Sequence, residues 1–216
     1  MKRSIGEKPA VSLLKKIQMR VRYGMTMYSI SSILQKIGME FTPYILYQEG
    51  INFMELSELK NISSDYSVEL LGPEDMKITG TFKTGFSEKE LVTLLNAGGK
   101  CIGLKHNGEI AASMWINLIE CNYKSTVFHL KNNEAYLWIM YTVESYRGKN
   151  LAPFLRYKSY EILKEMGRDV LYSISDYFNS PAVKFKKKLN AKPLKIILFV
   201  KLFNKFSWSF TLKSYK

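Results

Sequence analysis

The sequence predicts a single α+β domain preceded by an N-terminal helical extension. Two strand-turn-strand patterns, one in the middle of the chain and one at its C-terminal end, predict antiparallel hairpins. Between them, a segment of helical periodicity over residues 151–166 is followed by an apolar run over residues 170–175, which is typical of a buried strand. No internal repeat or flexible linker separates these segments, so we expect them to share one core.

Length and composition also indicate a globular protein. The chain has 216 residues, of which 46% are hydrophobic and 24% charged, and these values argue against disordered, collagen-like and low-complexity classes. The two cysteines and two histidines show none of the spacings that bind zinc, so no metal is expected. The apolar runs are far shorter than the roughly 20 residues of a membrane span, and the N-terminus lacks the pattern of a signal peptide. We therefore expect a cytoplasmic protein.

The positive charge is concentrated at the two ends of the chain. Residues 1–38 hold eight Lys or Arg and one Glu, and residues 181–216 hold ten Lys and no acidic residue. The net charge of +13 therefore leaves residues 39–180 slightly acidic. Such an imbalance is typical of proteins that bind a nucleic acid, an anionic membrane or a phosphate-bearing ligand, and a solvated surface is the alternative explanation.

The first part of the chain has the pattern of basic amphipathic helices. From residue 9 to residue 37, basic residues alternate with apolar ones at helical spacing, and Gly38 is placed to end the last helix. We interpret residues 1–60 as an extension that packs on the core or on a partner such as a second subunit, and residues 61–216 as the main domain. A short strand is expected at Phe41–Tyr47. The apolar positions are Leu14, Ile17, Val21, Met25, Tyr28, Ile30, Ile33, Leu34 and Ile37.

The next elements have local signals of their own. Val68–Leu71 is expected to form a strand, and Pro73 to begin a helical turn. Ser87 and Glu90 have the spacing of a capping box, which predicts a helix from residue 88 through Leu95.

A strand meander is expected to follow. Asn107-Gly108 tolerates positive φ at both turn positions, so residues 101–105 and 110–118 are predicted to form a hairpin. We expect residues 125–130 and 135–143 to extend this meander, with the last run central because both of its faces are apolar.

The C-terminal part alternates helix and strand. After the helix over residues 151–166 and the strand over residues 170–175, residues 181–189 have the pattern of a short basic helix. A final hairpin is expected from residues 196–203 and 206–212.

The segment with the clearest chemistry lies between the central strand and the long helix. Such a turn presents unpaired backbone N–H groups at the positive end of a helix dipole, which is a site for phosphate. Arg147 and Lys149 add full positive charges beside it. The sequence therefore predicts pyrophosphate binding here, although basic glycine turns are also common at helix starts.

This turn resembles a signature of the GNAT superfamily of coenzyme A-dependent N-acetyltransferases, Arg/Gln-x-x-Gly-x-Gly/Ala after the fourth strand. Arg147 and Ala152 match it, whereas Asn150 replaces a glycine. Asn is the non-glycine residue that most readily adopts left-handed geometry, so the loop is still expected to form. A second segment, from Asn179 to Ala191, is similar to the family's Asn-x-x-Ala-x-x-Phe-Tyr-x-Lys-Leu-Gly-Phe.

The resemblance covers residues 66–213 and implies a mixed, mostly antiparallel central sheet flanked by helices. It further implies that the strands over residues 135–143 and 170–175 splay apart, and that the pantetheine arm pairs with exposed strand backbone. Acetyl-coenzyme A or another acyl-coenzyme A is the implied donor, with no metal. The implied binding residues are Tyr141, Val143, Arg147, Gly148, Lys149, Asn150, Leu151, Ala152, Asn179 and Lys186.

Acyl transfer to an amine also needs a proton acceptor. Some family members carry a glutamate at the start of the fourth strand, where this chain has Glu134, although Glu134 would also be suited to a solvent-facing turn. His129 is the second candidate for catalysis, with Asp176 and Glu144 as further alternatives. The family's usual acid is a tyrosine of the second segment, and Lys186 stands there instead. We expect Lys186 either to contact phosphate or to face solvent.

The resemblance does not identify the acceptor. The basic, tyrosine-bearing extension favours a nucleotide-linked amino sugar, and a protein lysine or another small amine is the alternative. Acyl chains longer than acetyl are compatible with such an enzyme. Contact between the N-terminal helix and an anionic membrane surface is a further hypothesis. A non-enzymatic module that binds nucleic acid is disfavoured by the acidic middle segment.

Overall fold

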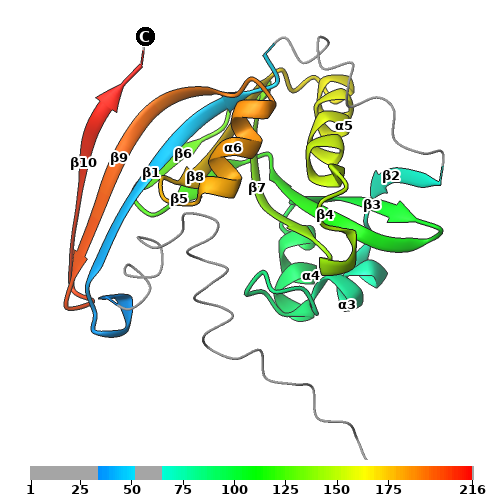
Figure 1. Cartoon of the computed structure of the whole chain (residues 1–216), viewed down its shortest axis with the longest axis horizontal. Coiled ribbons are helices and arrows are strands. Elements are labelled where there is room, and N and C mark those ends of the chain that lie inside the picture. Colours follow the sequence, from blue (N-terminus) through cyan, green and yellow to red (C-terminus); the bar gives the residue numbers. More distant parts are fainter. Residues whose placement is uncertain (1–33, 52–64, 216) are drawn as a thin grey trace, which may run out of the picture.

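A computed structural model describes residues 34–51 and 65–215, which fold around one large twisted sheet (Figure 1). Ten strands, four α-helices and two 3-10 helices are assigned within this part of the chain. The strands are β1 (Glu40–Glu49), β2 (Tyr66–Leu70), β3 (Lys100–His106), β4 (Glu109–Asn117), β5 (Glu120–Tyr123), β6 (Thr126–His129), β7 (Glu134–Thr142), β8 (Val170–Asp176), β9 (Lys192–Leu202) and β10 (Phe206–Ser214). The helices are η3 (Pro73–Asp75), α3 (Met76–Thr79), α4 (Glu88–Asn96), η4 (Glu144–Tyr146), α5 (Leu151–Glu165) and α6 (Ser180–Lys188).

The main sheet has eight strands in the order β10-β9-β1-β8-β7-β4-β3-β2. Every neighbouring pair is antiparallel except β7 and β8, which are parallel. Figure 1 shows α5 on one side of the β7–β4–β3 region and α3 with α4 on the other. The predicted α+β class, with a mostly antiparallel sheet flanked by helices, is therefore confirmed.

Strand β1 occupies an internal position of this sheet, between β8 and β9. The sequence had placed its ten residues in an extension that ends at residue 60. Residues 40–49 are instead part of the sheet, because both backbone edges of β1 are paired. Gly38 has φ +78° and ends the helical turn that precedes β1, as expected. The amphipathic pattern at positions 9–33 lies outside the described residues.

The meander also differs from the expectation. β4 pairs directly with β7, whereas β5 and β6 form a separate two-stranded sheet. The expectation that residues 125–130 extend the main sheet is therefore wrong. Alternating apolar residues indicate a strand but do not specify which strand it pairs with. The β5–β6 hairpin is held instead by Tyr44 of β1, whose hydroxyl forms hydrogen bonds with Ser125 and Thr126 at 3.1 and 2.8 Å.

Two hydrophobic clusters fill the two faces of the sheet. Leu155 and Leu163 of α5 are fully buried against one face, with Met114 of β4. Leu91 of α4 and Trp115 of β4 are buried on the other face. Alternation along β4 explains the split, since consecutive strand residues point to opposite faces.

Local signals position the remaining elements as expected. Ser87 caps α4 by accepting a hydrogen bond from the Glu90 N–H, and the Glu90 carboxylate accepts one from the Ser87 N–H. Asn107 and Gly108 both have positive φ, at 50° and 83°, in the turn that joins β3 to β4. Among the described helices, none is both long and apolar enough to cross a membrane.

Candidate active site

A cleft opens where β7 and β8 separate. The two strands pair from Glu134 and Val170 as far as Leu137 and Ser173, and no further pairing joins them beyond that point. Near the divergence, Ile139 adopts φ +28°, and the register between β7 and β4 shifts at a bulge. Bulges bend a strand and re-aim its side chains, so this irregularity accompanies the splay.

A cavity of about 470 Å³ occupies the gap between the two strands. The residues around it come from both strands, from α5 and α6 and from the β5–β6 hairpin. Asp176, at the end of β8, brings a carboxylate to this lining, and Tyr123 donates a short hydrogen bond to it. Burial and the Asp176 charge raise the pKa of Tyr123, so the phenol remains protonated. Trp138 adds an indole ring.

A second cavity of about 340 Å³ adjoins the first and is surrounded by the predicted phosphate loop. Thr142, Ala152, Pro181 and Phe185 line both cavities, so the two adjoin along these residues and are together called the groove. Five residues of the predicted coenzyme A loop, Arg147, Gly148, Asn150, Leu151 and Ala152, line the second cavity.

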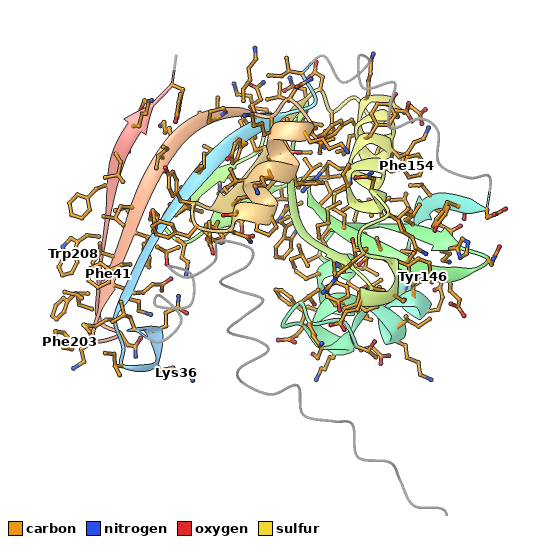
Figure 2. All side chains as sticks on the ribbon, in the orientation of Figure 1. Lys36, Phe41, Tyr146, Phe154, Phe203 and Trp208 are labelled. Atoms are coloured by element: carbon orange, nitrogen blue, oxygen red, sulfur yellow. The ribbon has the colours of Figure 1, made fainter. Side chains whose placement is uncertain are left out.

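The loop adopts the geometry that its sequence requires. Gly148 has φ +82°, and Asn150, the N-cap of α5, has φ +57° in the left-handed region. The Arg147 side chain donates from Nε to the Thr142 carbonyl oxygen at 3.1 Å. Because the first N–H groups of a helix have no intrahelical acceptor, the start of α5 presents donors to this cavity. Lys149 lies outside the lining, with its Nζ 5.2 Å from the ring centre of Tyr146, the residue labelled before α5 in Figure 2.

Two lysines of α6 complete the positive charge of this groove. Lys184 and Lys188 are exposed and line the second cavity. The Lys188 ammonium also donates a hydrogen bond to Asn150 Oδ1 at 3.1 Å. Sequence reasoning singled out Lys186 rather than these two. Their separation of four residues, which places them on one helix face, was the available signal.

Lys186 is directed away from solvent. Its side chain is 3% exposed and its Nζ lies 3.0 Å from the Glu49 carboxylate, with a short hydrogen bond to Ser173. The expectation that Lys186 faces solvent is therefore wrong. The residue does line the first cavity, but its ammonium is engaged in a buried ion pair rather than in the phosphate loop.

Glu49 is the centre of this buried network, which sequence reasoning missed. Tyr160 donates to its carboxylate at 2.6 Å, and Arg156 Nε lies 3.5 Å from it. Burial raises the pKa of Glu49, but the charges of Arg156 and Lys186 outweigh that effect and hold it at about 2. Burial lowers the pKa of Lys186 to about 8, against the opposing effect of Glu49. The available signal was a glutamate two positions after Tyr47, where alternation places it on the same face of β1 as that apolar residue.

The backbone groups of β7 that face the gap between β7 and β8 are not those of Tyr141 and Val143, the residues predicted to pair with the pantetheine arm. The Val143 N–H donates to the Ala111 carbonyl at 3.0 Å and is therefore committed to β4. Alternation gives Tyr141 the same orientation, so Met140 and Thr142 turn their backbone groups toward the gap. Both Met140 and Thr142 line the first cavity. The prediction of Tyr141 and Val143 is thus displaced by one residue.

The two residues first predicted to be catalytic lie outside the lining of the cleft. Glu134 belongs to the paired part of β7, where its carboxylate accepts from the Lys131 N–H at 2.9 Å and from the Tyr172 hydroxyl at 3.2 Å. His129 is exposed at the end of β6. Glu144 is exposed and pairs with Lys83 at 2.7 Å. Asn179 does line the cleft, and its side chain caps α6 by accepting from the Ala182 N–H.

Comparison with known families identifies the family of this chain. A family model described as acetyltransferase (GNAT) family matches residues 57–190, which is more than half of the chain. The chain belongs to the GNAT acetyltransferase family. Members of this family use acetyl-coenzyme A as the donor, and the groove at the splayed strands of this GNAT chain leads to the basic loop before α5.

Solved structures share the GNAT fold at low sequence identity. A GNAT-family acetyltransferase from Colwellia psychrerythraea has a TM-score of 0.55 at 15% identity, over 90% of this chain and 75% of that one. A GCN5-related N-acetyltransferase-like protein from Streptococcus suis has a TM-score of 0.54 at 12% identity, over 88% and 68%. A putative GNAT acetyltransferase from Novosphingobium aromaticivorans has a TM-score of 0.52 at 16% identity, over 76% and 66%.

Several of these relatives are longer than the present chain. The match spans 58% of a Drosophila protein and 60% of a tandem GNAT protein from the clavulanic acid biosynthesis pathway. No curated protein matches the chain.

Proposed function

We propose that this GNAT protein transfers an acetyl or longer acyl group from coenzyme A to a primary amine. The observation that carries the proposal is the continuity of the groove from the splayed strands to the basic loop of α5. Coenzyme A has matching parts, an extended pantetheine arm and a pyrophosphate. Arg147 and Lys184 would hold the pyrophosphate together with the first amides of α5, and the backbone of Met140 and Thr142 would pair with the arm.

The chemistry requires one proton acceptor at the reacting end of the groove. The amine nitrogen forms a bond to the thioester carbon, the carbon–sulfur bond breaks, and its electron pair leaves with the thiolate, while the amine gives up a proton. Asp176 is the carboxylate in the lining, and we assign proton acceptance to it. The protonated Tyr123 beside it would orient the carboxylate. This assignment replaces Glu134, whose carboxylate is engaged in its own turn.

For the acceptor, we propose an amine on a polar, sugar-like molecule, with a nucleotide-linked amino sugar as the first compound to test. Support comes from Trp138 and Tyr123, whose rings offer apolar surface, and from the Asp176 carboxylate, which can accept hydrogen bonds from hydroxyl and amine groups. A protein lysine or another small amine would use the same transfer chemistry.

The test measures free thiol released from acetyl-coenzyme A, and from longer acyl-coenzyme A, by the full-length protein. UDP-linked amino sugars, lysine peptides and polyamines serve as acceptors. Amine-dependent thiol release supports the transferase, and a preference for the UDP-linked compounds supports the acceptor. If neither acetyl- nor longer acyl-coenzyme A raises the melting temperature at high concentration, the proposal is wrong, because a ligand of the native state must stabilise it.

A further inference from the structure

The outer arm of the sheet has an inverted pattern of polar and apolar residues. In β10, Ser207, Ser209 and Thr211 alternate with Phe206, Trp208 and Phe210. Ser209 contacts Ser125 of the β5–β6 hairpin, so the small polar residues face the protein. Since strand residues alternate between faces, the three aromatic residues point the opposite way. Half-buried strands normally show the reverse arrangement.

The aromatic residues of β10 belong to a continuous apolar face. The register places Leu202, Val200 and Leu198 of β9 directly opposite Phe206, Trp208 and Phe210. Phe41 of β1 lies opposite Val200 on the next strand. We call this set the outer aromatic face; it consists of Phe41, Leu198, Val200, Leu202, Phe206, Trp208 and Phe210.

The outer aromatic face is open in the described part of the protein. Phe206, Trp208 and Phe210 are 57%, 47% and 53% exposed, and Phe41 is 41% exposed. Figure 2 shows Phe41, Phe203 and Trp208 on the arm that lies farthest from Phe154 and Tyr146. At the tip of this arm, Phe203 is 68% exposed. An open apolar face of this kind marks an interaction site.

Charge around the face indicates what covers it. Residues 192–215, which hold β9, β10 and the turn between them, contain five lysines and no acidic residue. Lys205 follows Phe203 by two residues in the turn between β9 and β10, and Figure 2 shows Lys36 at the same end of the arm. Glu40, an acidic residue of β1, is on the opposite face and pairs with Lys124. Exposed aromatic rings on strands that carry lysines and no acidic residue are typical of protein surfaces that lie at the interface of anionic membranes.

We propose that the outer aromatic face docks on an anionic lipid surface, with Phe206, Trp208 and Phe210 entering the headgroup region and the nearby lysines binding lipid phosphates. A second copy of this chain would bring the same lysines together, and residues 1–38 would add further positive charge. The rings of Phe206 and Trp208 already stack on each other, with centroids 6.1 Å apart, and the β9 residues beside the rings are aliphatic; both features disfavour the base stacking that a single-stranded nucleic acid needs. This surface is separate from the groove, so the proposal does not depend on the proposed function.

The test is vesicle co-sedimentation of the full-length protein. Binding is compared between phosphatidylcholine vesicles and vesicles that also contain about 30% phosphatidylglycerol. We expect binding to the anionic vesicles only. A variant with Phe206→Ser, Trp208→Ser and Phe210→Ser should bind at least about tenfold more weakly, because buried apolar area is lost. The matched control changes three residues of similar exposure elsewhere, Ile78→Ser, Ile119→Ser and Val127→Ser, and should bind like the original protein.

A second measurement needs no folded triple variant. Trp208 fluorescence should move to shorter wavelength on anionic vesicles and be quenched by brominated lipids, and a Trp208→Phe protein should lose that response. Three outcomes would overturn the proposal. They are undiminished binding of the triple variant, equal binding to neutral vesicles, and a Trp208 response that follows protein concentration or an added oligonucleotide instead of lipid.

Discussion

The ammonium of Lys186 lies 3.0 Å from the carboxylate of Glu49, and this contact joins α6 to a strand that precedes it by 137 positions. Both side chains are almost fully buried. Arg156 of α5 and Ser173 of β8 approach the same carboxylate, so four elements meet at one charge. Because α5 and α6 also line the groove, the network fixes the helices that form the site.

Removing the central charge of this network should destabilise the protein strongly. Glu49→Ala leaves Lys186 and Arg156 buried without a counter-charge, and we expect a loss of about 3–5 kcal/mol in the free energy of unfolding. Urea or thermal unfolding measures the change. The control is Glu144→Ala, which removes an exposed carboxylate and should leave stability nearly unchanged, because water screens its ion pair. Equal effects of the two variants would contradict the importance of the buried network.

The same network predicts how stability depends on acid. The pKa of Glu49 is about 2 in the folded protein, below its ordinary value of 4.5. The unfolded state therefore binds more protons in this window, and the contribution of Glu49 is complete above about pH 4.5 and declines as the pH falls toward 2. Melting temperatures between pH 7 and pH 2 should fall less steeply for Glu49→Gln than for the original protein, although the variant starts lower. Parallel curves would refute the assignment.

Coenzyme A binding should depend on the basic groove and not on positive charge in general. Arg147→Ala and Lys184→Ala each remove one charge beside the second cavity, and each should raise the dissociation constant of coenzyme A by roughly tenfold. Lys187→Ala is the matched control, since Lys187 is exposed on the same helix but lies outside that lining. Isothermal titration calorimetry of the three variants distinguishes direct contact in the groove from general attraction by positive charge. A similar loss of coenzyme A affinity in all three variants would indicate general attraction.

The two carboxylates proposed as bases can be told apart kinetically. Asp176→Asn should lower kcat by about 10²–10⁴, because a positioned proton acceptor is lost, while coenzyme A affinity is retained. Glu134→Gln should leave kcat within about threefold, since its carboxylate serves its own turn. The reverse result would restore Glu134 as the base.

Two substitutions of Asn150 test the backbone conformation of the loop, because they should have different effects on coenzyme A binding. Asn150 has φ +57°, which glycine adopts freely and β-branched residues avoid. Asn150→Gly should preserve coenzyme A binding, even though the contact from Lys188 is lost. Asn150→Val should weaken binding and lower stability by about 1–2 kcal/mol. Equal behaviour of both variants would show that the contact, and not the backbone, is what matters.

Most elements could be predicted from the sequence because their signals are local. The capping residues of α4 and the Asn107-Gly108 turn act within a few positions, and both were placed correctly. The position of β1 between β8 and β9 could not be predicted, since it depends on pairing with strands more than a hundred residues away. The same limit explains why the β5–β6 hairpin was assigned to the main sheet.

The candidate site shows the same difference between local signals and long-range contacts. The loop at Arg147 and Asn150 carries its basic and turn-forming residues within a few positions, so a site at this turn could be inferred from sequence, and the loop does line a cavity. The burial of Lys186 could not be predicted from the sequence. Whether a lysine of a basic helix points inward depends on an acidic partner, and its partner Glu49 lies in a strand distant in sequence. The sequence offers Asp176 only as a further alternative for the proton acceptor. The structure places it beside the cleft because β7 and β8 diverge there.

The internal position of β1 has a consequence for biosynthesis. During translation, residues 40–49 leave the ribosome long before β8 and β9, the two strands between which β1 is paired. The apolar strand that contains Ile45, Leu46 and Tyr47 therefore remains unpaired while more than a hundred further residues are synthesised. Contacts of such long sequence separation slow folding and expose apolar edges meanwhile. The nascent chain is thus expected to depend on chaperones until its last strands are complete.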